Sequence, residues 1–235
     1  MVLVVLGQSN AASTNEADGF IPRDGVDNLN PADGLIYRAR DPLLGASHGT
    51  PPMTASFATV LGDLLLKQGL AERVVLLDIA IGGSTIAAWA IGPLNYRIAQ
   101  AGRCLRALRL RPTFILQHIG ESDASEPPSA SLGQKFLRFQ RLVVRDFRRH
   151  GMNCPYFIAG VARMVDFNLP ESQALIRGAQ RAACDPASRV FPGPDTDVLG
   201  KEFRADVVHF NRKGRWAHAE MWVDVLRPHL KSRQS

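Results

Sequence analysis

The sequence lacks the features that would place it in a membrane. Its mean hydropathy is −0.06, and no apolar run approaches the roughly 18 to 20 residues that cross a bilayer. The apolar start, residues 1–6, is too short for a secretory leader and has neither a basic beginning nor a small-residue cleavage site. We expect no membrane span and, as the sequence stands, a cytoplasmic protein. Removal of a leader before this numbering begins would leave the same sequence, so a periplasmic or secreted location stays open.

Cysteine is scarce as well. The chain has only Cys104, Cys154 and Cys184, with no Cys-x-x-Cys pair and no neighbouring histidine cluster. Isolated thiols of this kind pack as small hydrophobic groups, so we expect three buried thiols and no metal site. The glycine and lysine patterns of dinucleotide- and phosphate-binding loops are also missing, so a phosphate-binding loop is not expected.

Aromatic residues make up only 7% of the chain, although its net charge is +6. A basic face is the usual footprint of nucleic-acid binding. Here the arginines are scattered along predicted helices, most densely over residues 138–149, and no aromatic side chains alternate with them as in a base-stacking surface. We interpret them as a solvated helix face and expect no nucleic-acid partner; the alternative predicts binding that weakens steeply with salt.

Short apolar, β-branched runs alternate with longer amphipathic stretches, which predicts an α/β fold with a parallel sheet buried on both faces. Five strands are predicted, at residues 2–6, 74–80, 113–118, 156–161 and 188–191. Helices are predicted at about 55–68, 95–109, 132–149, 171–183 and 212–227, the last one beginning after Asn211 and closed by Pro228.

Residues 11–52 differ from the rest because they are rich in Gly, Pro, Asp and Asn and show almost no periodicity. We predict a long loop, and loops of this length in a compact domain are usually functional or disordered. No repeat or linker interrupts the chain, so residues 1–235 are predicted to form one domain; the sequence does not specify its oligomeric state.

The first block that carries chemistry is Gly7-Gln8-Ser9-Asn10, at the carboxyl end of the first predicted strand. Open α/β sheets bind their ligands at that edge. A glycine before the serine permits a sharp turn that exposes the hydroxyl, as in other strand-to-turn nucleophiles. The alternative is a serine that caps an ordinary turn.

The second block is Asp206-Val207-Val208-His209, just before the last helix. A serine hydroxyl becomes a useful nucleophile when a neighbouring base removes its proton, and a carboxylate that orients the base improves it. Asp206 and His209 would supply both groups from one short segment. The pair is a weak signal alone, since this spacing also arises by chance.

Two glycine-containing turns follow the second and third strands. Gly82 and Gly83 lie in Ile81–Thr85, where a backbone N–H could approach a developing oxyanion; a plain βα turn is the alternative. Gly120-Glu121-Ser122-Asp123 follows the third strand and by itself is also typical of a capped turn. The order of the four blocks places them all at one edge of the sheet.

The ordered blocks GQSN, IGGST, GESDA and DVVHF resemble the SGNH (GDSL-like) hydrolases, in particular the branch of sialic-acid O-acetylesterases and acetyl xylan esterases of carbohydrate esterase family 6. The resemblance covers residues 3–222. It implies a three-layer αβα sandwich, flavodoxin-like in layout, and a cofactor-free serine esterase acting on small acyl, mainly acetyl, esters of carbohydrates. Mapped onto this sequence, it implies a catalytic triad of Ser9, Asp206 and His209, with oxyanion donors from Ser9 and Gly83, or Gly82 if the loop is shifted by one residue. Candidate substrate-binding or supporting residues are Gln8, Asn10, Trp89, Gly120 and Glu121.

One position departs from this branch, which usually has Gln-Gly-Glu at the third block where this chain has Ile119-Gly120-Glu121. The identity of the third oxyanion donor then stays open: Gln117 and His118 are the neighbouring alternatives, and on an extended strand Gln117 shares the face of Ile119 whereas His118 does not. A catalytically weakened protein that binds an acylated glycan is therefore the alternative function. Trp89 is equally well explained as a core residue. His48, in the long loop, is interpreted as solvent-exposed, with a contact to substrate as the alternative. His118, His218 and His229 have no carboxylate at a suggestive position and are expected to be structural.

Overall fold

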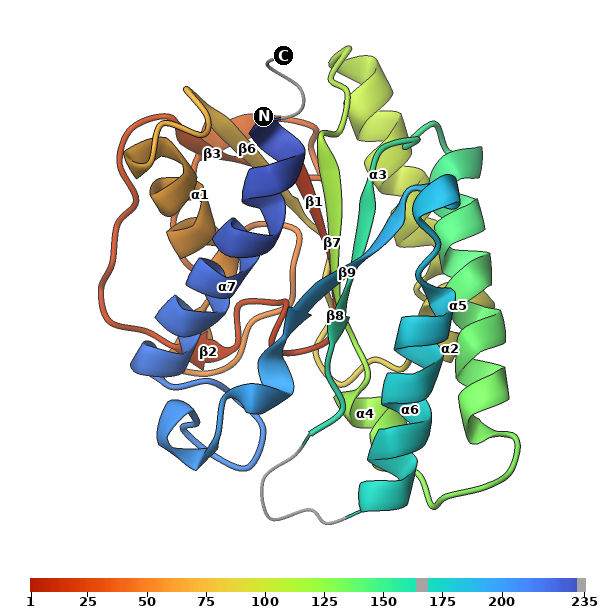
Figure 1. The fold of residues 1–235 in the computed structure, drawn as a ribbon. Helices are drawn as coiled ribbons and strands as arrows, with labels where there is room; N and C mark the ends of the chain where they lie inside the picture. Colours follow the sequence, from red (N-terminus) through yellow and green to blue (C-terminus); the bar gives the residue numbers. More distant parts are fainter. Residues whose placement is uncertain (164–168, 232–235) are drawn as a thin grey trace.

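A seven-stranded sheet forms the middle layer of the computed structural model, which describes residues 1–163 and 169–231 (Figure 1). The strands, in order across the sheet, are β4 (Ile36–Arg38), β3 (Val26–Leu29), β6 (Val74–Asp78), β1 (Val2–Gly7), β7 (Phe114–His118), β8 (Tyr156–Gly160) and β9 (Val190–Asp195). Every neighbouring pair is parallel except β3 with β4. The five strands expected from the sequence are present, and their order β6-β1-β7-β8-β9 is the flavodoxin-like one.

The predicted number of five strands is wrong, because the segment 11–52 contributes two more. β3 extends the sheet beyond β6, and β4 forms its exposed edge. A further pair, β2 (Asn15–Glu16) and β5 (Met53–Ala55), forms a separate small sheet. These strands are two to four residues long, too short for alternation of apolar and polar residues to identify them, so pairing with neighbours determines them.

Helices cover both faces of the sheet (Figure 1). α1 (Phe57–Lys67) and α7 (Arg212–Lys231) pack on one face. The other face is covered by α2 (Ile86–Ala90), α3 (Asn95–Ala107), α4 (Glu121–Ala124), α5 (Leu132–Arg149) and α6 (Pro170–Ala183). β1 serves both layers, because its alternate side chains enter the two separate apolar clusters. The three-layer αβα prediction is confirmed.

The last helix runs past the proline that was expected to close it. α7 continues to Lys231 with Pro228 inside. Proline removes one backbone hydrogen bond, a small loss in a final turn. Leu230, buried in the core, holds that turn against the sheet. Of the described helices, none is long and apolar enough to span a membrane.

The cysteines differ in burial: Cys154 is buried, whereas Cys104 and Cys184 are only partly so, which corrects the expectation of three buried thiols. Among residues 1–163 and 169–231, no group of three His, Cys, Asp or Glu side chains is arranged to hold a metal ion.

Candidate active site

The turn that carries Ser9 follows β1 at the sheet edge where the parallel strands end, the lower edge in Figure 1. Gly7 is required there, because a Cβ would overlap the His118 carbonyl oxygen of the adjacent β7. The Gln8 N–H donates to that same oxygen over 3.1 Å. The Thr14 hydroxyl donates to the Ser9 carbonyl, and Ser9 is 7% exposed. The close approach of β1 and β7 thus fixes the backbone of the candidate nucleophile.

Asp206 and His209 contact each other directly in the segment before α7. The Asp206 Oδ2 lies 2.7 Å from His209 Nδ1, and its Oδ1 accepts the N–H groups of Val208 and His209 over 2.8 and 2.6 Å. Partial burial would raise the pKa of Asp206, but these hydrogen bonds, the one from the His209 ring foremost, outweigh it and hold the pKa below its ordinary value. The side chains remain 48% and 28% exposed. The pair is therefore an ionised carboxylate that orients an accessible imidazole.

Asn10 joins the Ser9 turn to the His209 segment. Its Nδ2 donates to the Val208 carbonyl over 3.0 Å, and its Oδ1 accepts the Phe210 N–H over 3.3 Å. The residues on both sides of His209 are thereby tied to the residue that follows Ser9. Within the described parts of the chain, no hydrogen bond joins the Ser9 hydroxyl to the His209 ring.

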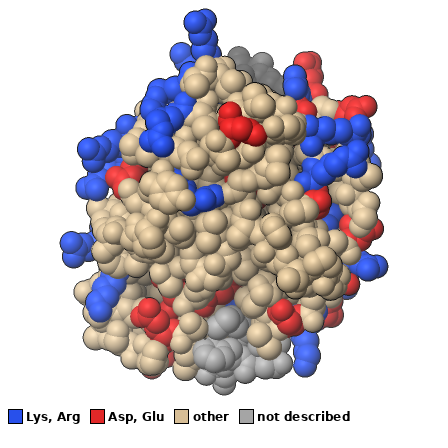
Figure 2. Space-filling view, turned by 180° about the vertical axis from the view of Figure 1, so that it is seen from behind, with Lys and Arg blue, Asp and Glu red and all other residues tan. Residues whose placement is uncertain are grey.

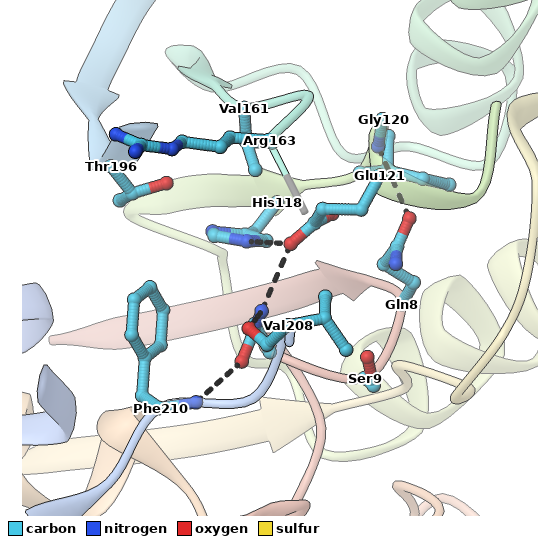
Figure 3. Close-up of polar contacts among 12 residues, drawn as sticks. Gln8, Ser9, His118, Gly120, Glu121, Val161, Arg163, Thr196, Val208 and Phe210 are labelled. Atoms are coloured by element: carbon cyan, nitrogen blue, oxygen red, sulfur yellow. Dashed lines mark hydrogen bonds and ion pairs between the residues drawn. The ribbon is translucent and has the colours of Figure 1, made fainter. Parts of the chain in front are cut away.

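A buried histidine–carboxylate pair, His118 and Glu121, contacts Asn10, and both of its members are labelled in Figure 3. His118 Nε2 is 2.9 Å from Glu121 Oε1, with side chains 1% and 0% exposed, and the same oxygen accepts from Asn10 Nδ2 over 3.0 Å. Burial would raise the pKa of Glu121, yet His118 and Asn10 lower it to about 2. The expectation that His118 has no partner carboxylate is wrong, because the turn after β7 brings Glu121 back beside it.

Arg204, for which no sequence pattern predicted a role, also contacts the segment that carries His209. It is 7% exposed, its guanidinium lies 4.1 Å from the centre of the Phe210 ring, and it donates to the Val208 carbonyl. Burial lowers its pKa. Arg204 and Asn10 thus hold the same carbonyl from two sides. The only sequence signal was an arginine five residues before His209, and that spacing is not specific.

The glycine turn after β6 lies against Ser9. A Cβ built on Gly82 would be 3.9 Å from the Ser9 Cβ. The Gly82 N–H is occupied, since it donates to Ser47 Oγ over 2.7 Å. Gly83 has a φ of 69°, and among the described residues none accepts its N–H. Of these two glycines, Gly83 is therefore the one whose backbone N–H is free to donate a hydrogen bond. Ser47 belongs to the segment 11–52, which leaves from the Ser9 turn and returns beside it.

Gln8 and Asp123 connect the turns to one another. Gln8 Oε1 accepts the N–H groups of Gly120 and Ser122 over 3.2 and 3.0 Å. Both Asp123 oxygens accept the Ile86 N–H, over 3.2 and 3.1 Å, at the start of α2. Burial raises the pKa of Asp123 to about 7 despite this hydrogen bond. The turn Gly120–Asp123 is therefore hydrogen-bonded both to the turn that carries Ser9 and to the start of α2, which follows the glycine turn.

Trp89 lies in the core with no exposed surface. Its indole N–H donates to Ser84 Oγ over 2.9 Å, and Ser84 Oγ donates to the Gly7 carbonyl over 3.3 Å. This placement favours support of the glycine turn over contact with substrate. His48, in contrast, is exposed and its Nδ1 lies 2.9 Å from the Gly49 carbonyl.

The family model described as carbohydrate esterase, sialic acid-specific acetylesterase, matches residues 1–226. The chain belongs to this family. It is a carboxylic ester hydrolase, and the family points to acetyl esters of carbohydrates as the type of substrate. A search of curated protein sequences gives no match.

Solved structures with the same architecture are distant in sequence. A protein from Arabidopsis thaliana is 16% identical with a TM-score of 0.75, covering 98% of this chain and 97% of that one. NanS is 15% identical with a TM-score of 0.67 over the same shares of the two chains. An acetyl xylan esterase is 12% identical with a TM-score of 0.57, covering 96% and 100%. At these identities the similarity establishes the fold alone.

The esterase has no side-chain amide at the position where its branch usually carries one. Ile119 is fully buried in the apolar cluster beneath α2, α3, α5 and α6. The Gln117 amide exchanges hydrogen bonds of 2.6 and 2.8 Å with Gln140, and it accepts the Tyr156 hydroxyl. His118 is committed to Glu121. The Gln117 amide and His118 Nε2 are therefore both engaged in contacts inside the protein.

Proposed function

We propose that this esterase removes acetyl groups from a carbohydrate through a covalent acyl-enzyme, with Ser9 as nucleophile, His209 as general base and Asp206 as the group that orients it. The observation that carries the proposal is the Asn10 clamp, which ties both flanks of His209 to the residue after Ser9. Because Asp206 occupies His209 Nδ1, the Nε2 atom is the ring nitrogen left to take a proton.

In the first step, His209 Nε2 accepts the Ser9 hydroxyl proton as the oxygen attacks the acetyl carbonyl carbon. The resulting oxyanion accepts hydrogen bonds from backbone N–H groups of Ser9 and Gly83. Its collapse breaks the ester bond, and the imidazolium returns the proton to the departing sugar oxygen. Water then attacks the acyl-enzyme and gives a proton to His209. As the second tetrahedral intermediate collapses, His209 returns this proton to the Ser9 oxygen, and acetic acid leaves and ionises to acetate.

The geometry of the glycine turn supports Gly83 rather than Gly82 as the oxyanion donor. The Gly82 N–H already donates to Ser47. No heavy atom lies within 4 Å of the position that a Cβ on Gly83 would occupy. One backbone donor of this kind is typically worth about 100- to 1000-fold in rate. With Ile119 in place of an amide, this donor and the Ser9 N–H carry the stabilisation, and we expect a slower enzyme than its relatives with glutamine.

The test is hydrolysis of p-nitrophenyl acetate and butyrate by the wild type, Ser9→Ala and His209→Ala. The matched control is Ser129→Ala, whose side chain is exposed between α4 and α5. Both active-site variants should remain folded by circular dichroism and lose about a thousandfold or more of kcat, while the control keeps wild-type activity. Retained turnover in folded Ser9→Ala would overturn the proposal.

The core position of Ile119 also favours a second candidate, a weakened protein that binds an acylated glycan. It predicts no burst of p-nitrophenol from the wild type but saturable binding of acetylated xylan or acetylated sialic acid. A burst equal to the enzyme concentration excludes it.

A further inference from the structure

A cavity opens at the edge of the sheet opposite the candidate active site, where the strands begin. It has a volume of about 650 Å³ and lies between the last turn of α3 with its following loop, the loop after α5, and the residue before β9. Its lining includes no described Asp or Glu and carries five basic side chains: Arg106, Arg109, Arg111, His150 and Arg189. Figure 2 shows Lys and Arg side chains gathering toward the upper left, on this side of the molecule.

Within the part of the chain that the structure describes, the four arginines of this cavity have no carboxylate partner. Arg106 donates to the His150 carbonyl over 2.7 Å and Arg189 to the Asn153 carbonyl over 3.4 Å. None of the ion pairs among residues 1–163 and 169–231 includes any of the four. By contrast, Arg215 lies near two carboxylates and Arg177 bridges two others. All four arginines are exposed and line one cavity, so an anion bound there would meet positive charge that no described carboxylate neutralises.

Arg109 occupies a backbone position that the fold normally gives to glycine. α1, α3 and α5 end in the same motif, with the second residue after the helix in the left-handed region: Gly69 at φ 66°, Arg109 at 54° and Gly151 at 84°. In each, that residue's N–H bonds back three residues, and the next N–H bonds back five. Glycine adopts this conformation without strain, whereas arginine does not.

Arg189 repeats the pattern, with a φ of 55° before β9. In the described parts of the chain, Arg109 and Arg189 are the only residues other than glycine with positive φ, and both line this cavity. Strained backbone of this kind is maintained mainly where the side chain serves a purpose. The need to end a helix does not explain why position 109 is an arginine, because Gly69 and Gly151 end their helices with the same backbone geometry.

We propose that this cavity binds a small ligand that carries a pyrophosphate group. Guanidinium groups pair bidentately with phosphoryl oxygens, and four of them match the charge of two linked phosphates better than that of one. The volume lies within the range of small-molecule sites, and buried Leu105 and Met152 supply apolar surface at the base. The ligand is either free pyrophosphate or a nucleoside diphosphate, and the site is separate from the esterase centre.

The test is isothermal titration of the full chain with pyrophosphate, ADP and orthophosphate at fixed ionic strength. The informative variants are Arg109→Gly and Arg189→Gly, because glycine suits both backbones and should leave the melting temperature equal or higher. Arg138→Ala, an exposed arginine of α5 outside the cavity, is the matched control.

We expect one-to-one binding of pyrophosphate and ADP, weakened about tenfold or more by either glycine variant and unchanged in the control. Equal affinity for the two would mean that the pyrophosphate group alone is recognised, and tighter binding of ADP would identify a nucleotide as the ligand. Absence of binding by the wild type, or equal weakening in Arg138→Ala, would overturn the proposal. Esterase activity should be the same in all variants.

Discussion

The active-site edge contains two histidine–carboxylate pairs with the same three-residue spacing and opposite surroundings. Asp206–His209 is 2.7 Å long and partly exposed, whereas His118–Glu121 is 2.9 Å long and almost completely buried. The accessible pair can exchange protons with substrate and water. The buried pair cannot, and its contacts with Asn10 make it a support for the segment that carries His209. Burial, rather than residue type or spacing, separates the two roles.

The largest effect is expected from removing the charge of the accessible pair. Asp206→Asn should lower kcat by about 10³- to 10⁴-fold, because the imidazole loses the carboxylate that orients it and stabilises its cation. The melting temperature should barely change, since Asp206 is about half exposed. A steady-state assay decides this: a loss of less than about tenfold would mean that another carboxylate does this work.

Breaking the buried pair should act on stability first. Glu121→Ala leaves His118 without its partner in the core, which we expect to cost about 3–5 kcal/mol in the free energy of unfolding. Urea titration against Glu126→Ala, an exposed glutamate nearby, measures the difference. If the two variants were equally stable, the buried pair would not be a structural support.

Lowering the pH should reduce the free energy of unfolding of the wild type through the buried His118–Glu121 pair. The pKa of Glu121 is about 2 in the folded chain, below its ordinary value of 4.5. The folded state therefore favours the carboxylate, and its contribution, about 3 kcal/mol, is complete above the ordinary value and lost as the pH falls toward 2. Urea unfolding at successive pH values should show a shallower loss in Glu121→Gln. Parallel curves would contradict the low pKa.

The link between the pairs should have the smallest effect. Asn10→Ala removes the hydrogen bonds to Val208 and Phe210, and we expect kcat to fall about 10- to 100-fold with little change in KM. Asn10→Asp, which places a second carboxylate beside Glu121, should be worse than alanine. An alanine variant with wild-type kcat would show that His209 is positioned without this link.

The sequence was informative where a pattern is local. A few consecutive residues contain each of the patterns used: the apolar strands, the turns that follow them, and the spacing of Asp206 and His209. The sheet edge and the candidate residues could therefore be predicted. The family model matching residues 1–226 agrees with the resemblance of the four blocks.

What could not be predicted depends on contacts between distant residues. β3 is a strand because β6 offers it an edge, and β4 is one because it pairs with β3, not because of their own residues. Gly82 and Gly83 are indistinguishable in sequence, and only the contact with Ser47 shows which N–H is occupied. The role of Arg204 likewise depends on a carbonyl that the Asn10 side chain also holds.

The most direct test of the central claim is covalent labelling with a fluorophosphonate, which reacts with an activated serine and leaves a stable adduct. Peptide mass spectrometry of the inactivated wild type should place the adduct on Ser9, in proportion to the activity lost, and Ser9→Ala should remain unlabelled. Inactivation with the adduct on another residue, or with Ser9 unmodified, would contradict the account.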